Sequence, residues 1–296
     1  MVKGKRHGRG TLLSLEGNRY KGEWKDDLEN GQGRRIHPDG SIHEGAFLDG
    51  KPNGNGKVTY RHQVFGFTYE GEFKDGLRSG RGREEKAQGV VYDGEYSKGL
   101  RNGKGTLTRK AQGKRDVKYV GEFKDDLPHG QGTMLYEDGA TYKGQFQKGF
   151  PHGSGKKTLP NNDTYDGSWV RGMKHGKGIL VTAAGDRYEG EFNQDKRTGK
   201  GTMTFGKDSP FNGDRYEGDF VDGKPDGQGT YTKASGVIYN GELKNGVPHG
   251  KGTSTLPNGK KISGLWDNGK PVAKPGNTTP KPPSVTAPKK NPETDN

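Results

Sequence analysis

One short pattern decides the fold of this chain: Tyr20-Lys21-Gly22-Glu23-Trp24, which returns as Tyr69-Glu70-Gly71-Glu72-Phe73 and again as Tyr119-Val120-Gly121-Glu122-Phe123. Its first residue, the leading residue, recurs in steps of 23 residues, with occasional steps of 26, 27 and 28. The leading positions are 20, 43, 69, 92, 119, 142, 165, 188, 216, 239 and 262. A period of this length, kept along most of the chain, is typical of a repeat protein.

The bulk composition points the other way. Hydrophobic residues make up only 25% of the chain and charged residues 29%, a balance usual for disordered proteins. However, 19 of the 27 aromatic residues lie in two columns of the repeat, at the leading position and four residues after it. Disordered chains show no such register. We therefore predict a folded repeat array over residues 1–270 and a disordered, proline-rich tail or linker over 271–296.

Each unit has the features of a β-hairpin. Alternate residues of a strand point to opposite faces, so Tyr20, Gly22 and Trp24 share one face. Glycine or aspartate follows seven residues after the leading residue, as a turn requires, and a Gly-X-Gly pair then opens a second strand. We expect the rings to cover strand glycines. Because one hairpin is marginal in water, we predict an all-β fold in which the hairpins stack into an elongated, single-layer antiparallel sheet.

These residues resemble a known repeat. The pattern Tyr-X-Gly-Glu-Trp/Phe, followed by Gly-X-Gly at 23-residue spacing, is similar to the MORN repeat (membrane occupation and recognition nexus) over roughly residues 1–270, in about eleven units. Departures from the pattern are His43, Ala46, Gln145, Ser168, Leu243 and Leu265. The resemblance implies an elongated sheet without a catalytic centre, which serves as a scaffold for partner proteins or, in some members, associates with membrane lipids.

Two patterns in the sequence also occur in proteins with other chemistry. Gly-X-Gly also occurs in nucleotide-binding loops, but there it joins one strand to one helix, whereas here it repeats in every unit. His129, His152, His175 and His249 each follow a leading residue by ten positions, yet neighbouring units are about 10 Å apart and zinc–nitrogen bonds are about 2.1 Å long. The chain has no cysteine. We therefore predict no catalytic residue, cofactor or metal, and no enzymatic activity.

The first candidate site is the sheet face that carries the rings. A single-layer sheet has no second layer to bury this face, so we expect a partly exposed aromatic groove that binds a protein partner, for example an amphipathic helix. The candidate residues are Tyr20, Trp24, Tyr69, Phe73, Tyr92, Tyr96, Tyr119, Phe123, Tyr142, Phe146, Tyr165, Trp169, Tyr188, Phe192, Tyr216 and Phe220.

The net charge of +13 supports a second hypothesis. Arg78, Arg101, Lys174 and Arg197 follow the turn between the two strands of their units, where a regular array would align them as a basic edge. Such an edge suits anionic phospholipid headgroups. The plainer interpretation is a solvated surface, because acidic residues are interleaved. Nucleic acid is disfavoured as a partner, since the aromatic residues are assigned to the fold. Self-association stays open.

The sequence also bears on location. No apolar run reaches the roughly 18 residues of a membrane span, and the residues after Met1 lack the apolar core of a signal peptide. Gly8 and Gly10 form the second half of a unit, so a signal or anchor upstream stays open. We expect a cytoplasmic, non-enzymatic scaffold for protein–protein interaction. The alternative is peripheral association with anionic membrane phospholipids.

Overall fold

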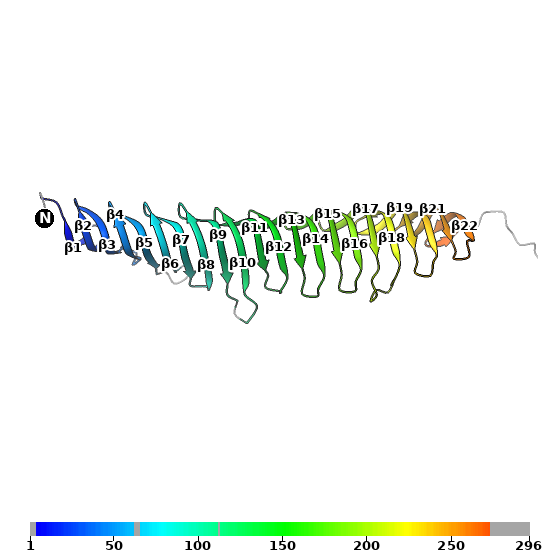
Figure 1. Cartoon of the computed structure of the whole chain (residues 1–296), viewed down its shortest axis with the longest axis horizontal. Coiled ribbons are helices and arrows are strands. Elements are labelled where there is room, and N and C mark those ends of the chain that lie inside the picture. The colour runs from blue at the N-terminus through cyan, green and yellow to red at the C-terminus, as the bar shows by residue number, and fades with distance from the viewer. Residues whose placement is uncertain (1–3, 62–65, 112, 273–296) are drawn as a thin grey trace, which may run out of the picture.

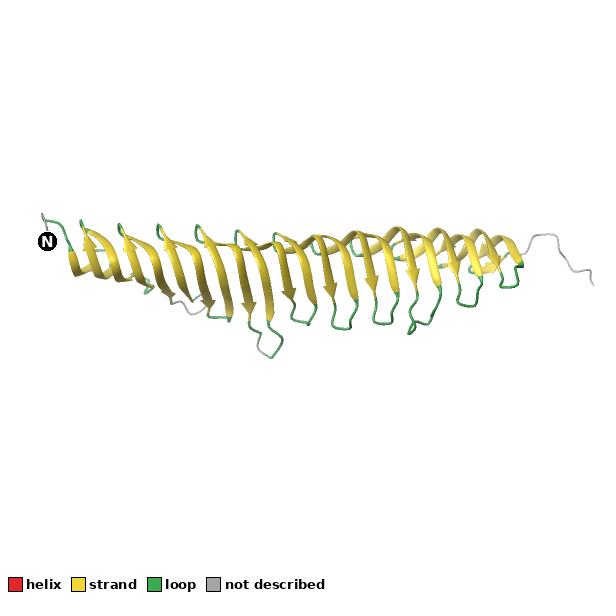
Figure 2. Cartoon of the chain, in the orientation of Figure 1, coloured by secondary structure: helices red, strands yellow, loops and turns green. Residues whose placement is uncertain are grey.

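The computed structural model describes residues 4–61, 66–111 and 113–272. Every regular element among them is a β-strand, and the 23 strands form one antiparallel sheet (Figures 1 and 2). Each strand pairs with the next along the chain, which makes the sheet a continuous, elongated meander. The predicted all-β single-layer fold is confirmed. From residue 273 on, the predicted tail lies outside the described residues.

Two kinds of strand alternate. Those that carry the leading residues are β2 (Arg19–Lys25), β4 (Ile42–Leu48), β6 (Phe67–Lys74), β8 (Val90–Ser97), β10 (Val117–Lys124), β12 (Thr141–Gln147), β14 (Thr164–Val170), β16 (Arg187–Asn193), β18 (Arg215–Val221), β20 (Ile238–Lys244) and β22 (Lys261–Asp267). Those that carry Gly-X-Gly are β1 (Gly8–Leu13), β3 (Leu28–Ile36), β5 (Lys51–Tyr60), β7 (Leu77–Lys86), β9 (Leu100–Arg109), β11 (Leu127–Leu135), β13 (Phe150–Thr158), β15 (Met173–Val181), β17 (Lys196–Thr204), β19 (Lys224–Thr232) and β21 (Val247–Thr255). The short strand β23 (Lys270–Pro271) follows β22.

A row of glycines crosses the sheet at one level. Gly22 of β2 pairs with Gly33 of β3, which pairs with Gly45 of β4, and the row continues to Gly264 of β22. The ring of the leading tyrosine lies across this row. A Cβ atom added at Gly33 would collide with the hydroxyl group and ring of Tyr20. The second glycine of each Gly-X-Gly pair is therefore needed for the close approach of a ring, as the sequence predicts.

The first glycine of the pair has a different task. In the hairpin of β10 and β11, Glu122 pairs with His129, and Gly130 and Gln131 bulge out before the glycine row resumes the pairing. Gly130 has a φ of 56°, in the left-handed region that favours glycine. The carboxylate of Glu122 accepts the N–H of Gln131 at 3.1 Å. The glutamate column thus satisfies the backbone of the bulge.

The core is a single file of rings. Tyr119 meets Phe123 of its own unit edge-on, with centroids 5.1 Å apart, and Phe146 of the next unit at 4.9 Å. The same alternation extends from Tyr20 to Phe220. Edge-on pairs contribute about 0.5–1.5 kcal/mol each beyond their burial. Every hairpin is thereby held by its neighbours.

Candidate interaction surface

The structure buries the rings that the sequence nominates for partner binding. From Tyr20 and Trp24 in the first complete unit to Tyr216 and Phe220 in the ninth, the exposed fraction of these residues is between 0% and 7%. Burial also raises the pKa of Tyr119 to about 12. The predicted partial exposure is wrong, because each ring is enclosed by the rings beside it, the glycines beneath it and further side chains on the same face.

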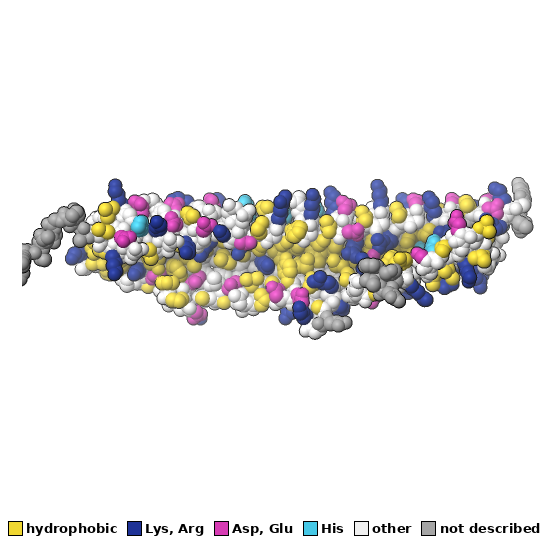
Figure 3. Space-filling view, turned by 180° about the vertical axis from the view of Figure 1, so that it is seen from behind, with side chains coloured by type: hydrophobic (Ala, Val, Ile, Leu, Met, Phe, Trp, Pro, Cys, Tyr) yellow, Lys and Arg dark blue, Asp and Glu magenta, His cyan; other side chains and the backbone are white. Residues whose placement is uncertain are grey.

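Those further side chains form the accessible surface of the ring face, the sheet face that carries the tyrosines. They lie 15 residues after the leading position, where each pairs with a tyrosine, as Met203 pairs with Tyr188. The apolar members that pack partly buried against the rings are Val58, Leu107, Met134, Leu180, Met203 and Tyr231. Hydrophobic side chains gather in a hollowed strip along this part of the molecule (Figure 3). These residues recur with the same period as the tyrosines but were not among the predicted binding residues.

Two hollows lie along the strip. A hollow of about 450 Å³ is lined by Tyr188, Phe192, Leu180, Arg197 and Met203, among others. Residues lining a second hollow, of about 400 Å³, include Arg35, His43, Val58 and Phe73. The opposite face has its own shallow hollows over the glycine row, one of about 470 Å³ lined by residues that include Gly94, Gly105 and Gly121. The two hollows on the ring face combine buried rings with half-buried cations, whereas the one at Gly94, Gly105 and Gly121 is lined by no ring.

The side chains of the four cations predicted to form a basic edge lie over the ring face instead. Their repeat position pairs across the hairpin with the second ring of the unit, as Arg197 pairs with Phe192, so the two share a face. The guanidinium carbon of Arg197 is 5.5 Å from the centroid of Tyr188, a cation–π distance. Equivalent contacts join Arg78 to Tyr69 at 5.7 Å, Arg101 to Tyr92 at 4.9 Å and Lys174 to Tyr165 at 5.8 Å. The predicted edge at Arg78, Arg101, Lys174 and Arg197 is therefore wrong.

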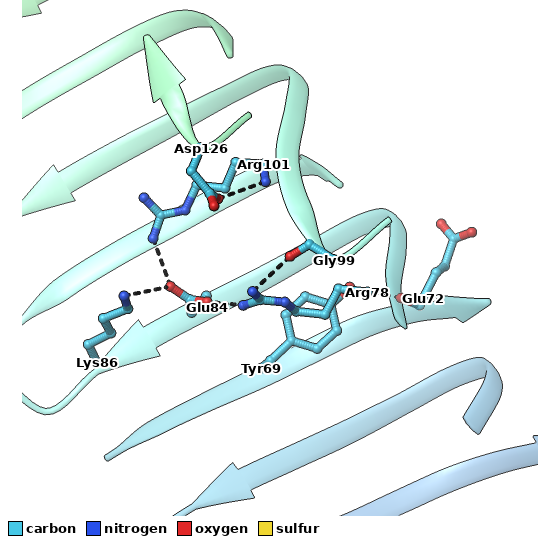
Figure 4. A network of polar contacts seen from close by, with 8 residues as sticks. All are labelled: Tyr69, Glu72, Arg78, Glu84, Lys86, Gly99, Arg101 and Asp126. Atoms are coloured by element: carbon cyan, nitrogen blue, oxygen red, sulfur yellow. Dashed lines mark hydrogen bonds and ion pairs between the residues drawn. The ribbon is translucent and has the colours of Figure 1, made fainter. Parts of the chain in front are cut away.

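Two of these cations share one buried carboxylate (Figure 4). The side chain of Glu84 is 5% exposed and forms ion pairs with Arg78, with Arg101 at 2.7 Å and with Lys86 at 3.5 Å. Burial by itself raises the pKa of Glu84, but the hydrogen bond from Arg101 and the neighbouring positive charges outweigh it and hold the pKa below its ordinary value. With three cations around one carboxylate, the cluster keeps an excess of positive charge.

The repeat itself has a known counterpart. A family model described as the MORN repeat matches residues 1–19, 20–42, 43–61, 69–91, 92–114, 119–141, 142–164, 165–187, 188–209, 216–238 and 239–261. The chain belongs to the MORN repeat family. Ten of the matched segments begin at a leading position, which confirms the predicted register of the MORN units.

Other comparisons add little to this MORN assignment. No curated protein sequence matches the chain. Among solved structures, it is similar to selenomethionine-substituted virginiamycin B lyase from Staphylococcus aureus at 11% identity, over 88% of this chain and 84% of that one, with a TM-score of 0.15. A similarity this weak carries no argument about the MORN sheet.

The opposite face of the MORN sheet has an exposed apolar row beside the tight turns. Leu77, Leu100 and Phe150 are 50%, 39% and 57% exposed. The exposed Lys74 pairs with Leu77 across its turn, and Lys98 is exposed in the turn before Leu100. We call these five residues the turn edge. The turn edge therefore combines exposed apolar side chains with lysines, and it does not include the predicted positions Arg78, Arg101, Lys174 and Arg197.

Two further properties concern the described part of the MORN chain. No three His, Cys, Asp or Glu side chains within residues 4–61, 66–111 and 113–272 are grouped so that they could hold a metal ion. The candidate histidines lie on separate strands: His129 on β11, His152 on β13, His175 on β15 and His249 on β21. These same residue ranges contain no helix of the length and apolar character that would let it cross a membrane.

Proposed function

We propose that this chain is a non-enzymatic scaffold that binds a segment of another protein along its ring face. The observation that carries the proposal is the apolar row over the buried rings. Leu180 and Met203 pack against Tyr188 but stay partly exposed, and they line the hollow of about 450 Å³. An elongated row of such side chains, repeated every 10 Å or so, offers many equivalent contacts to an extended or helical partner.

The roles of the recurring residues also favour a scaffold over an enzyme. The glycine pairs, which resemble a nucleotide-binding motif in sequence, serve as bulge and ring-contact positions inside strands. The tyrosine hydroxyl groups donate to backbone carbonyl oxygens, as Tyr188 donates to Glu191 at 3.0 Å. Groups that satisfy the backbone in every unit have a structural task.

Site-specific photo-crosslinking tests the proposal. A photoreactive amino acid replaces Leu180 on the ring face in one variant and Ile179, its neighbour on the opposite face, in the other, and both are expressed in the native cell. We expect a defined protein adduct from position 180 that is absent from position 179, and that re-forms with the purified adduct protein. Adducts of equal yield from both positions, or none from position 180, would contradict ring-face binding.

A second candidate function is peripheral association with anionic phospholipid membranes, favoured by the turn edge. The exposed side chains of Leu77 and Leu100 could enter the headgroup region while Lys74 and Lys98 meet lipid phosphates, each worth about 1 kcal/mol near the surface. This arrangement does not involve Arg78 or Arg101, whose charges are engaged with Glu84.

Co-sedimentation with liposomes tests the second candidate. We expect the chain to pellet with anionic but not with neutral liposomes at about 0.1 M salt, and to be released at about 0.5 M salt, where charges are screened. Replacing Leu77 and Leu100 by serine should weaken binding, whereas the same change at Leu180 should not. Binding that is insensitive to the turn-edge serines would exclude this surface.

A further inference from the structure

One cation of the ring face lacks the carboxylate that its repeat position has elsewhere. In the unit led by Tyr69, Arg78 faces Glu84, six residues further on, and forms an ion pair with it. In the unit led by Tyr188, the same two positions are Arg197 and Met203. Arg197 Nη1 lies 3.6 Å from Met203 Sδ, a weak acceptor, so the geometry of the Arg78–Glu84 pair is kept while its negative charge is missing.

The other ring-face cations at this repeat position are paired. Arg6 contacts Asp27 at 3.0 Å, Arg101 contacts Glu84 at 2.7 Å and Lys174 contacts Asp195 at 3.8 Å. Within the described ranges, no carboxylate lies within 4.0 Å of the guanidinium group of Arg197. Asp186 and Asp195 line the same hollow, and the charge of Asp186 acts on Arg197 from beyond contact distance. Burial lowers the pKa of Arg197. A half-buried guanidinium without a carboxylate in contact is costly, and a carboxylate supplied from outside would relieve that cost.

The surroundings of Arg197 define what else the carboxylate must be attached to. The hollow beside it is walled by Leu180 and Met203 and floored by Tyr188 and Phe192, so it accepts apolar side chains. Lys174 stands one unit away at the same repeat position. One unit of two strands extends about 10 Å along the sheet. Seven residues of an α-helix extend about 10.5 Å along the helix axis. A helix lying along the strip would thus present residues seven apart to Lys174 and Arg197.

From this geometry we propose that the ring face binds an amphipathic helix of a partner protein, with an apolar stripe over Leu180 and Met203 and a carboxylate bound to Arg197. A second acidic residue of the helix, seven residues away, faces Lys174, whose ion pair with Asp195 is long at 3.8 Å. The proposal rests on the proposed scaffold function and names its partner: a helix whose acidic residues recur at heptad spacing beside the apolar stripe. The groups contributed by this chain are the cation–π-held guanidinium of Arg197 and the apolar hollow next to it.

Synthetic peptides test the chemistry without knowledge of the natural partner. Two stapled helices of about 20 residues share the same leucine stripe; one carries glutamate at every seventh flanking position and the other glutamine. Their affinities for the full chain are measured by fluorescence anisotropy. We expect the glutamate peptide to bind about tenfold more tightly than the glutamine peptide. The ratio should fall as salt concentration rises.

Three variants locate the effect. Arg197→Met removes the charge, and Met203→Glu supplies the missing carboxylate from within the chain, as Glu84 does for Arg78. Each should reduce the affinity ratio severalfold, and the contact with Lys174 accounts for what remains. Met203→Glu should also raise the thermal unfolding midpoint, which verifies that it is folded. The control Lys200→Gln changes an exposed cation of the same strand on the opposite face and should leave the ratio unaltered.

The outcomes separate this inference from the function on which it rests. An affinity ratio that survives Arg197→Met overturns the role of Arg197. Equal binding of both peptides to the unaltered chain also overturns it, but leaves the apolar strip as a protein-binding surface. If neither peptide binds while anionic liposomes do, the inference and the protein-scaffold function fail together, and the lipid candidate takes their place.

Discussion

Asp126 binds the backbone of Arg101, on the preceding hairpin, in two ways: its Oδ1 accepts the N–H of Arg101 at 2.9 Å, and its own N–H donates to the carbonyl oxygen of Arg101 at 3.0 Å. Between the next two hairpins only the second bond forms, from Gly149 to Pro128 at 2.9 Å, because proline has no N–H. The aspartate link recurs between Asp27 and Arg6 and between Asp195 and Lys174. At these links, an aspartate in the turn of one unit therefore lies opposite a residue of the preceding unit whose backbone N–H it can accept.

The hydrogen bond from Arg101 to Asp126 predicts that two substitutions of Asp126 lower the free energy of unfolding by different amounts. Asp126 has a φ of 69°, which asparagine tolerates better than alanine does. Asp126→Ala should lower the free energy of unfolding by roughly 2 kcal/mol, since it removes the acceptor for Arg101 and adds backbone strain. Asp126→Asn keeps an acceptor and should cost less than about 0.5 kcal/mol. Urea unfolding of both variants is the measurement, and equal costs would contradict the role of the bond.

The glycine row makes a steric prediction. A methyl group at Gly132 would collide with Tyr119, so Gly132→Ala should cost roughly 3 kcal/mol. Gly149 is a matched control: its φ is 86°, but a methyl group there meets nothing within 4 Å. Gly149→Ala should cost only the roughly 1–2 kcal/mol of backbone strain. Chemical denaturation of the two variants compares them, and a smaller loss at Gly132 would show that Tyr119 yields easily.

His43 replaces a leading tyrosine and makes stability depend on pH. Its Nε2 is buried without a hydrogen-bond partner, and burial lowers its pKa to about 4. An unfolded histidine takes up its proton near pH 6.5, whereas the folded one stays neutral until about pH 4. The folded state therefore loses roughly 3 kcal/mol of stability from this residue as the pH falls between those values.

His43→Tyr should remove that slope. A tyrosine restores the ring of the other units, and its hydroxyl group can donate to the carbonyl oxygen three residues on, as Tyr69 donates to Glu72 at 2.9 Å. We expect the variant to be more stable than the wild type at pH 7, with the difference growing towards pH 4. Unfolding free energies measured at intervals across this range test it. Parallel pH profiles of the two proteins would show that His43 does not titrate as described.

The cluster around Glu84 predicts that removing this one carboxylate greatly lowers the free energy of unfolding. Glu84→Ala leaves Arg78 and Arg101 partly buried without their counter-charge, which should cost roughly 3–5 kcal/mol. Glu85→Ala, next to it but 56% exposed at the side chain, should cost less than about 0.5 kcal/mol. Because the pKa of Glu84 is lowered, its contribution is present at neutral pH and disappears as the pH falls through that pKa. A pH-independent difference between wild type and Glu84→Ala would refute this account.

The sequence alone determined the fold because every strand pairs only with the strands that precede and follow it along the chain, so one repeating pattern specifies all the pairings. Tyr119, Gly121 and Phe123 alternate within one strand, so their common face follows from strand geometry. Stacking the units then repeats one solution along the whole sheet. The 23-residue repeat was enough to predict the hairpins, the contacts between rings and glycines, and a sheet of one layer.

Only the tertiary structure decided which surface a partner can reach. Alternation assigns a face within a strand, but the sequence pattern placed Arg197 beside the turn and did not show where the strand begins. In the structure β17 already begins at Lys196, so that Arg197 pairs with Phe192 and shares the ring face with Met203. Burial of the rings depends on side chains contributed by the neighbouring strands, which pattern within one unit does not show. Cross-strand pairing therefore decided two features that the pattern of one unit does not show: the rings are buried beneath an apolar strip, and the cations expected at a basic edge lie beside that strip.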